Sequence, residues 1–183
     1  MGVPSGTRSD IERLEREGLA RLLAAVRETD VGPAPPVQVG RLAALWLLVR
    51  GLGAGAVLAV GAIHLQQYVV LYSAVPTIGT LFLLNFAGAT VIGLGLLAPL
   101  ERLLGARWGA AAVGMLALAG IVLAAVALVF LTIAEHTPLF GFLEPGYHPG
   151  AILASRVAEV AAIVLLGSFL VGRLLSRAPK RHW

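Results

Sequence analysis

Three polar side chains stand in apolar stretches of the sequence, where a lipid bilayer would exclude them: His64, Asn85 and Glu159. Each lies eight residues from one end of its stretch, which places it roughly 12 Å below that end because a helix rises about 1.5 Å per residue. A charged residue near the middle of a membrane helix costs about 2.5–3.5 kcal/mol on insertion scales. That cost falls when polar residues face one another, so we expect the three to share one layer inside a helical bundle.

Two further residues extend this layer. Tyr68 follows His64 by one helical turn, and Arg156 precedes Glu159 by three positions, a spacing at which a salt bridge is geometrically available. The sequence therefore predicts an inward-facing polar cluster of His64, Tyr68, Asn85, Arg156 and Glu159. Two interpretations stay open: a hydrogen-bonded layer that fixes helix packing, or a pocket for a small molecule or lipid.

A loop rich in aromatic, proline and glycine residues, EHTPLFGFLEPGYHPG at 135–150, is expected to cover this cluster. That composition favours an ordered loop that folds back over the bundle. We call this loop the outer lid. Its candidate functional residues are Glu135, His136, Glu144 and His148.

Several chemistries find no support in the residues. The chain has no cysteine, which excludes disulfides, thiolate catalysis and iron–sulfur clusters. No spacing of two histidines on one helical face indicates a metal site, and only His64 lies within an apolar stretch, so a haem with two axial histidines is not indicated. No phosphate-binding loop, nucleophile elbow or dinucleotide motif is present. We expect no cofactor and no bound metal, and the residues favour a protein that is not an enzyme.

The elements that position these residues follow from composition. Hydrophobic residues make up 58% of the 183 residues and charged residues 13%, against roughly 45–50% and 25% in soluble domains. A membrane-spanning helix needs about 20 apolar residues. Four runs meet that length, at 51–72, 77–99, 108–134 and 151–172. The start of the first run is open, because ALWLLV at 44–49 extends it upstream and Arg50 could flank the span or lie just inside it. The sequence predicts an all-α protein, with a four-helix transmembrane bundle at 41–174.

Charge placement predicts the orientation. Arginines and lysines lie before the first span, between the second and third, and after the fourth, whereas the connections 73–76 and 135–150 contain none. Basic residues favour the cytoplasmic side, so both termini are expected in the cytoplasm of a multi-pass cell-membrane protein. The basic tail 175–183 is expected to contact anionic lipid headgroups. Because this topology accounts for the net charge of +4, we expect no nucleic-acid partner.

The first 40 residues differ from the rest. Ser9 and Glu12 form a capping box, and an amphipathic helix is predicted over 9–29, followed by the Pro/Gly linker VGPAPPVQVG at 31–40. The helix carries four arginines against five acids and lacks the basic face of a lipid anchor. Two readings stay open: it packs against a protein partner or a second copy of the chain, or it only orders the N-terminus.

The stretch AIHLQQYVVLYSAVPTIGTLFLLN at 62–85 resembles a pattern of small four-span membrane proteins of high-GC Gram-positive bacteria, which share IHL, a tyrosine one turn later, PTIG and LFLLN. AEHTPLFGFLEPG at 134–146 is similar to a second signature of that group. The resemblance implies the fold and the membrane location and carries no activity.

For function, we expect a ligand-binding or partner-assembly module with a polar pocket near the outer leaflet. The alternative is a small proton-coupled transporter that uses Glu159. Arg156 weighs against this alternative because a nearby cation favours the ionised carboxylate, and no inverted repeat is evident.

Overall fold

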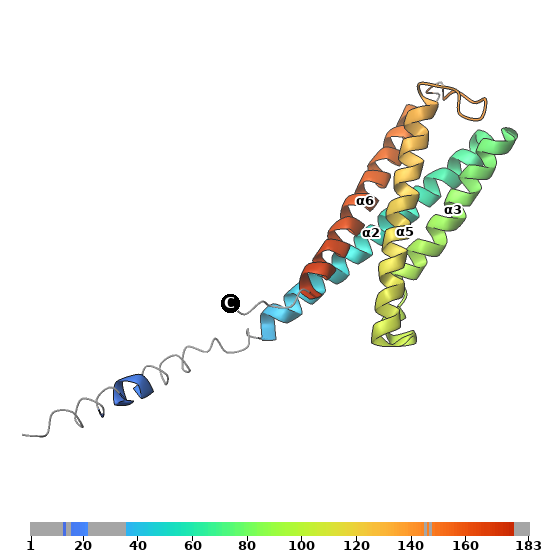
Figure 1. Ribbon diagram of the computed structural model, residues 1–183. Helices are drawn as coiled ribbons and strands as arrows, with labels where there is room; N and C mark the ends of the chain where they lie inside the picture. The colour runs from blue at the N-terminus through green and yellow to red at the C-terminus, as the bar shows by residue number, and fades with distance from the viewer. Residues whose placement is uncertain (1–12, 14–15, 22–35, 145, 147, 178–183) are drawn as a thin grey trace, which may run out of the picture. The chain divides into compact units, whose positions relative to one another are not determined.

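The computed structural model describes Arg13 and residues 16–21, 36–144, 146 and 148–177. Its element order is α2 (Pro36–Val70), η1 (Tyr72–Ala74), α3 (Pro76–Leu97), α4 (Leu100–Leu103), α5 (Gly105–Ala134) and α6 (Pro149–Arg177) (Figure 1). Within the described ranges there is no strand, and one isolated β-bridge joins Leu139 to Phe142. Helices α2, α3, α5 and α6 are long and apolar enough to cross a membrane. The predicted all-α, four-span architecture is confirmed.

The helix that contains the first span extends well upstream of residue 51. Helix α2 begins at Pro36, so residues 36–40 of the expected linker are helical and the helix continues without a break through 41–50. Proline is compatible with the first turn of a helix because the N–H that it lacks has no helical partner there. At the C-terminal end of the described chain, α6 runs to Arg177 and enters the expected tail, of which residues 178–183 lie outside the described part.

The chain divides into two compact units, Met1–Arg41 and Leu42–Trp183. In the first, Arg13 and residues 16–21 are helical, and the Arg13 Nε lies 3.5 Å from the Glu17 Oε1. The rest of the predicted helix 9–29 lies outside the described residues. Its partner, whether another protein or a second copy, stays a prediction.

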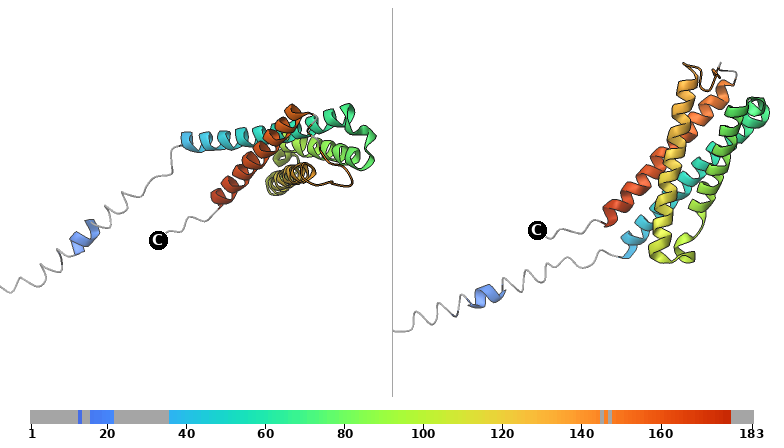
Figure 2. Two further views of the ribbon diagram at one scale, coloured as in Figure 1. Left: turned by 90° about the horizontal axis from the view of Figure 1, so that it is seen from above. Right: turned by 45° about the vertical axis from the view of Figure 1, so that its right-hand side comes forward.

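In the second unit, small residues let the helices approach closely. α5 packs against both α6 and α3 (Figure 1 and Figure 2), and α2 packs on α6 and α3 through glycines. A Cβ added to Gly53 would lie 2.6 Å from Leu166 Cδ2, and one added to Gly61 would lie 2.8 Å from the Ala89 Cβ. Close packing of this kind stabilises helix pairs in lipid, where no hydrophobic effect drives helices together.

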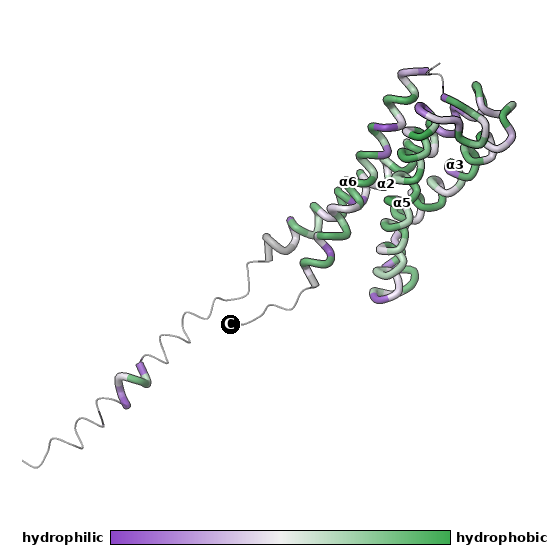
Figure 3. Tube along the Cα trace, turned by 45° about the horizontal axis from the view of Figure 1, so that its top comes forward, coloured by the Kyte–Doolittle hydropathy of each residue, from purple (hydrophilic) through white to green (hydrophobic). Residues whose placement is uncertain are grey.

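The outside of the bundle is apolar. Hydrophobic residues predominate along all four long helices in Figure 3, and large side chains such as Leu47, Val91 and Met115 are 64%, 68% and 73% exposed. An exposed apolar surface of this extent is typical of a protein in contact with lipid. The surface therefore agrees with the four candidate membrane spans.

A buried arginine fixes the end of the bundle away from the outer lid. Arg50 is 8% exposed within α2. Its Nε donates to the Leu96 carbonyl at 2.6 Å, its Nη2 to the Ala98 carbonyl at 2.8 Å, and its Nη1 to Glu101 Oε1 at 2.9 Å. Carbonyls at the C-terminus of a helix lack intrahelical partners and attract a cation. Arg50 thus joins α2 to the end of α3.

Candidate functional site

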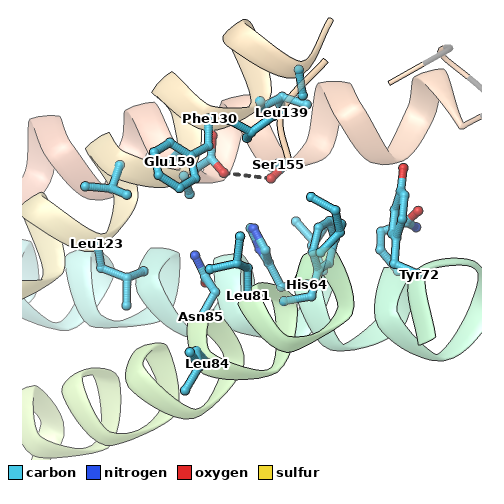
Figure 4. A pocket seen from close by; sticks show the side chains of 18 of the residues that line it. His64, Tyr72, Leu81, Leu84, Asn85, Leu123, Phe130, Leu139, Ser155 and Glu159 are labelled. Carbon is cyan, nitrogen blue, oxygen red and sulfur yellow. Dashed lines mark hydrogen bonds between the residues drawn. The ribbon is translucent and has the colours of Figure 1, made fainter. Parts of the chain in front are cut away.

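A cavity of about 690 Å³ lies between α2, α3, α5 and α6, at the end of the bundle that carries the outer lid. Figure 4 shows it from close by. Its walls are mostly apolar, with contributions from all four long helices. The polar and titratable side chains in the lining are His64, Gln67, Tyr72, Asn85, Glu144, His148, Ser155 and Glu159.

Three of the five residues of the predicted polar cluster line this cavity. His64 on α2 and Asn85 on α3 lie on one side, and Glu159 on α6 lies opposite, beside Ser155 (Figure 4). Their depth along the spans predicts one layer for these three residues, and in the structure they surround one cavity. Tyr68 and Arg156 do not line it.

Glu159 is the most deeply buried of these polar residues, at 1% exposed. Its Oε1 accepts a hydrogen bond of 2.8 Å from the Ser155 hydroxyl, one helical turn away. Its Oε2 is buried and has no hydrogen-bond partner among the described residues. Because buried polar atoms are nearly always paired, an orphaned carboxylate oxygen beside a cavity requires an explanation.

The spacing of Arg156 and Glu159 makes a salt bridge available, but the structure does not form one. Arg156 Nη2 pairs instead with the Glu135 Oε2, at the start of the outer lid. The reason is that a carboxylate from another segment reaches the half-exposed guanidinium, whereas Glu159 points into the bundle. Glu159 therefore has a hydroxyl, and no guanidinium, as its hydrogen-bond partner.

His64 and Asn85 also present acceptors. The His64 Nδ1 lies 2.8 Å from the Val60 carbonyl, which makes this nitrogen the donor and leaves the other ring nitrogen as an acceptor in the neutral ring. The ring packs 5.0 Å from that of Phe82, measured between centroids. Asn85 Oδ1 is buried without a partner in the part of the chain that the structure describes.

The outer lid is tied to the bundle by Tyr72 and Glu144. The Tyr72 hydroxyl donates to Glu144 Oε2, the Gly146 N–H donates to Glu144 Oε1 at 3.0 Å, and the Glu144 N–H donates to the Ala134 carbonyl at 2.8 Å. Burial, together with the bond and charge of Glu144, raises the pKa of Tyr72 well above its ordinary value of 10.0. The lid is therefore anchored to η1 at one edge of the cavity.

The remaining candidate residues have different environments. His136 is exposed and bonds the Thr132 carbonyl at 2.8 Å, outside the cavity lining. His148 is exposed at the cavity edge. Tyr68 is half-buried and lies against Gly79, where an added Cβ would be 3.3 Å from its ring. Of the four candidate functional residues in the lid, Glu144 and His148 line the cavity, and Glu135 and His136 do not.

Sequence reasoning missed three polar lining residues: Gln67, Tyr72 and Ser155. Ser155 could have been found, because it precedes Glu159 by four positions and shares its helical face. Gln67 lies one turn from His64 and could have been found in the same way. No spacing rule connects Tyr72 to Glu144, since 72 positions separate them.

The cavity is open sideways, between α3 and α5. Leu84 on α3 is 63% exposed, and Leu118 and Val122 on α5 are 56% and 53% exposed, yet all three line the cavity. Side chains that both line a cavity and lie on the surface mark its mouth. This mouth is on the apolar surface and would face the hydrocarbon of a bilayer.

Within the described residues, no group of three or more His, Cys, Asp or Glu side chains is arranged to hold a metal ion. No protein-family model, curated protein or solved structure matches the chain. The resemblance of 62–85 and 134–146 to small four-span proteins thus stays a prediction.

Proposed function

We propose that this protein is a multi-pass protein of the cell membrane that binds a small molecule in the cavity between its four helices. One observation carries the proposal: Glu159 is 1% exposed, and its Oε2 lacks a partner beside a cavity of about 690 Å³. A buried polar atom without a hydrogen bond destabilises the protein. A ligand that supplies the missing bond removes that cost, so the site suits binding better than packing.

We place the cavity near the outer leaflet, with both termini in the cytoplasm. In support, Arg102, Arg107 and Arg173 lie at the end of the bundle away from the lid, as the preference of basic residues for the cytoplasmic side predicts. Trp108 beside them is 71% exposed and lies 6.0 Å from the Arg107 guanidinium. Exposed tryptophan is typical of the membrane interface.

The proposal is tested with a tryptophan reporter in the cavity wall. Phe130 lines the cavity, and Phe130→Trp in nanodiscs is titrated with brominated dodecyl amphiphiles, whose bromine quenches tryptophan. Val91→Trp is the matched control, because Val91 is 68% exposed on α3 and does not line the cavity. The signal of the three native tryptophans is subtracted with the parent chain.

We expect saturable quenching for Phe130→Trp and a weak, linear response for Val91→Trp. A binding site saturates, whereas partition into lipid does not. Equal and linear quenching at both positions, with every amphiphile, would refute the proposed function.

A second candidate function, proton-coupled transport by Glu159, is favoured by one observation. Arg156 pairs with Glu135 and not with Glu159, so the main argument against this alternative is weakened. The test is ethidium-driven proton release from proteoliposomes that contain a pH-sensitive dye. Loss of release in Glu159→Gln, with release kept in Ser168→Ala on the same helix, would support transport, and no release from the wild type would exclude it for this cation.

A further inference from the structure

We infer that the ligand is a lipid-soluble primary amine, which enters sideways between α3 and α5 and places its ammonium group among His64, Asn85 and Glu159. This inference rests on the proposed function and specifies the chemistry of its ligand. Three independent features carry it: the hydrogen-bonding character of the polar groups, the charge of the lining, and the position of the mouth.

The two buried side-chain atoms that lack partners among the described residues are both acceptors. Glu159 Oε2 and Asn85 Oδ1 are buried without hydrogen bonds in the described structure. The second ring nitrogen of His64 is an acceptor in the neutral ring, because Nδ1 faces the Val60 carbonyl. The Ser155 hydroxyl donates to Glu159 already. A ligand that donates hydrogen bonds satisfies these atoms, and a primary ammonium has three N–H donors for three acceptors.

The charge of the lining selects a cation. Its described residues include Glu144 and Glu159 and neither arginine nor lysine. Glu144 accepts hydrogen bonds from Tyr72 and from the Gly146 N–H, so Glu159 is the carboxylate with a free oxygen. A fatty acid would bring a second negative charge to this place, which is unfavourable. An alcohol would supply one donor and no charge.

The mouth determines where the apolar part of the ligand lies. Leu84, Leu118 and Val122 are more than half exposed between α3 and α5, and they line the cavity. An alkyl chain in this slot contacts apolar side chains on one side and bilayer hydrocarbon on the other. At the lid end, Tyr72 is bonded to Glu144 at the edge of the cavity. Entry from the bilayer is therefore the direct path.

The experiment compares three brominated dodecyl probes, the amine, the alcohol and the carboxylic acid, in nanodiscs of zwitterionic lipid at pH 7, with Phe130→Trp as reporter. We expect the amine to bind at least about tenfold more tightly than the other two, since hydrogen bonds to charged groups contribute about 1.5–3 kcal/mol. Glu159→Gln in this background should weaken amine binding about tenfold or more. Ser168→Ala, on the same helix and outside the lining, should leave it unchanged.

A second variant tests the same site in case Glu159→Gln does not fold. Asn85→Leu removes one acceptor without touching a charge and should weaken amine binding several-fold. Size-exclusion chromatography of both variants establishes that they are folded. Amine binding that survives both substitutions unchanged would overturn the inference.

The outcomes separate the inference from the proposed function. Saturable binding of the alcohol or the acid as tight as that of the amine overturns the ligand chemistry and leaves the function standing. Absence of saturable binding for all three probes overturns both.

The entry route has its own test: Val122→Phe should slow amine association several-fold, whereas Val91→Phe should not. Equal rates in the two variants would overturn lateral entry.

Discussion

The Tyr72 hydroxyl donates a hydrogen bond to the Glu144 carboxylate, and this bond joins the turn between α2 and α3 to the loop between α5 and α6. The ring of Phe142 packs edge-on against Tyr72, with centroids 5.4 Å apart. Tyr72 is 5% exposed, so this contact is part of the buried structure at the lid end of the cavity. We therefore expect the mobility of the lid to depend on this contact.

Tyr72→Phe is expected to loosen the lid without altering the cavity walls. The substitution keeps the ring contacts and removes one hydrogen bond to a carboxylate, so the free energy of unfolding should fall by about 1 kcal/mol. Hydrogen exchange at residues 139–144 should accelerate. Tyr68→Phe is the control, because the structure gives no hydrogen bond for the Tyr68 hydroxyl, and a lid that exchanges equally fast in both variants would contradict the coupling.

The same contact predicts a loss of stability at alkaline pH. Burial raises the pKa of Tyr72 above its ordinary value of 10.0, so above about pH 10 the unfolded chain loses the phenolic proton while the folded chain retains it. Where the folded state binds more protons than the unfolded state, the free energy of unfolding falls as the pH rises. Thermal melts from pH 8 to 11 should show a decline that begins near pH 10 and is smaller in Tyr72→Phe. An identical decline in both proteins would assign it to other groups.

The four spans and the layer of polar residues could be predicted from the sequence because both depend on local properties. Runs of about 20 apolar residues identify a span, and distance from the end of the span sets depth. His64, Asn85 and Glu159 were grouped by depth alone, and they line one cavity.

Contacts between distant segments could not be predicted in this way. Spacing along α6 makes a pair of Arg156 with Glu159 available. It cannot show that Glu135, which lies on another segment, reaches the Arg156 guanidinium. The Pro/Gly content of 31–40 likewise predicts a linker, whereas α2 already begins at Pro36, because proline is compatible with the first helical turn.

Arg50 is expected to be essential for the end of the bundle away from the lid. Its guanidinium donates to the Leu96 and Ala98 carbonyls and to Glu101. Arg50→Ala leaves these acceptors without their donor and should lower the free energy of unfolding by about 3 kcal/mol. Arg50→Lys should recover only part of this loss, because an ammonium cannot reproduce the planar fork of a guanidinium.

The measurement is a detergent-denaturation curve for each variant. Arg102→Ala is the matched control, since Arg102 is exposed and its loss should change stability by less than about 0.5 kcal/mol. An Arg50→Ala variant as stable as Arg102→Ala would show that the buried network contributes nothing.

Gly109 is expected to tolerate no side chain. A Cβ at this position would lie 2.4 Å from the Glu101 Cα and 2.4 Å from the Leu100 carbonyl oxygen, and backbone atoms cannot turn aside as a flexible side chain does. Gly109→Ala should therefore destabilise the protein by about 3 kcal/mol, at the upper end of overpacking effects. Gly114→Ala on the same helix meets an atom at 3.9 Å and should be neutral or stabilising by up to about 1 kcal/mol. Denaturation curves that rank the two variants in the opposite order would disprove the close approach of α4 to α5.

Glu159 is expected to behave as a residue that reduces stability when no ligand is bound. Its Oε2 is buried without a partner, and an unsatisfied buried group costs about 1–3 kcal/mol. Glu159→Gln removes the charge and keeps a carbonyl to accept from Ser155, so the ligand-free variant should be at least as stable as the wild type and up to about 1 kcal/mol more stable. Glu101→Gln is the matched control, since the Glu101 carboxylate accepts from Arg50 at 2.9 Å and its substitution should destabilise. A Glu159→Gln variant that loses as much stability as Glu101→Gln in thermal melts would make the buried carboxylate a structural element, because a residue retained for binding should not be needed for folding.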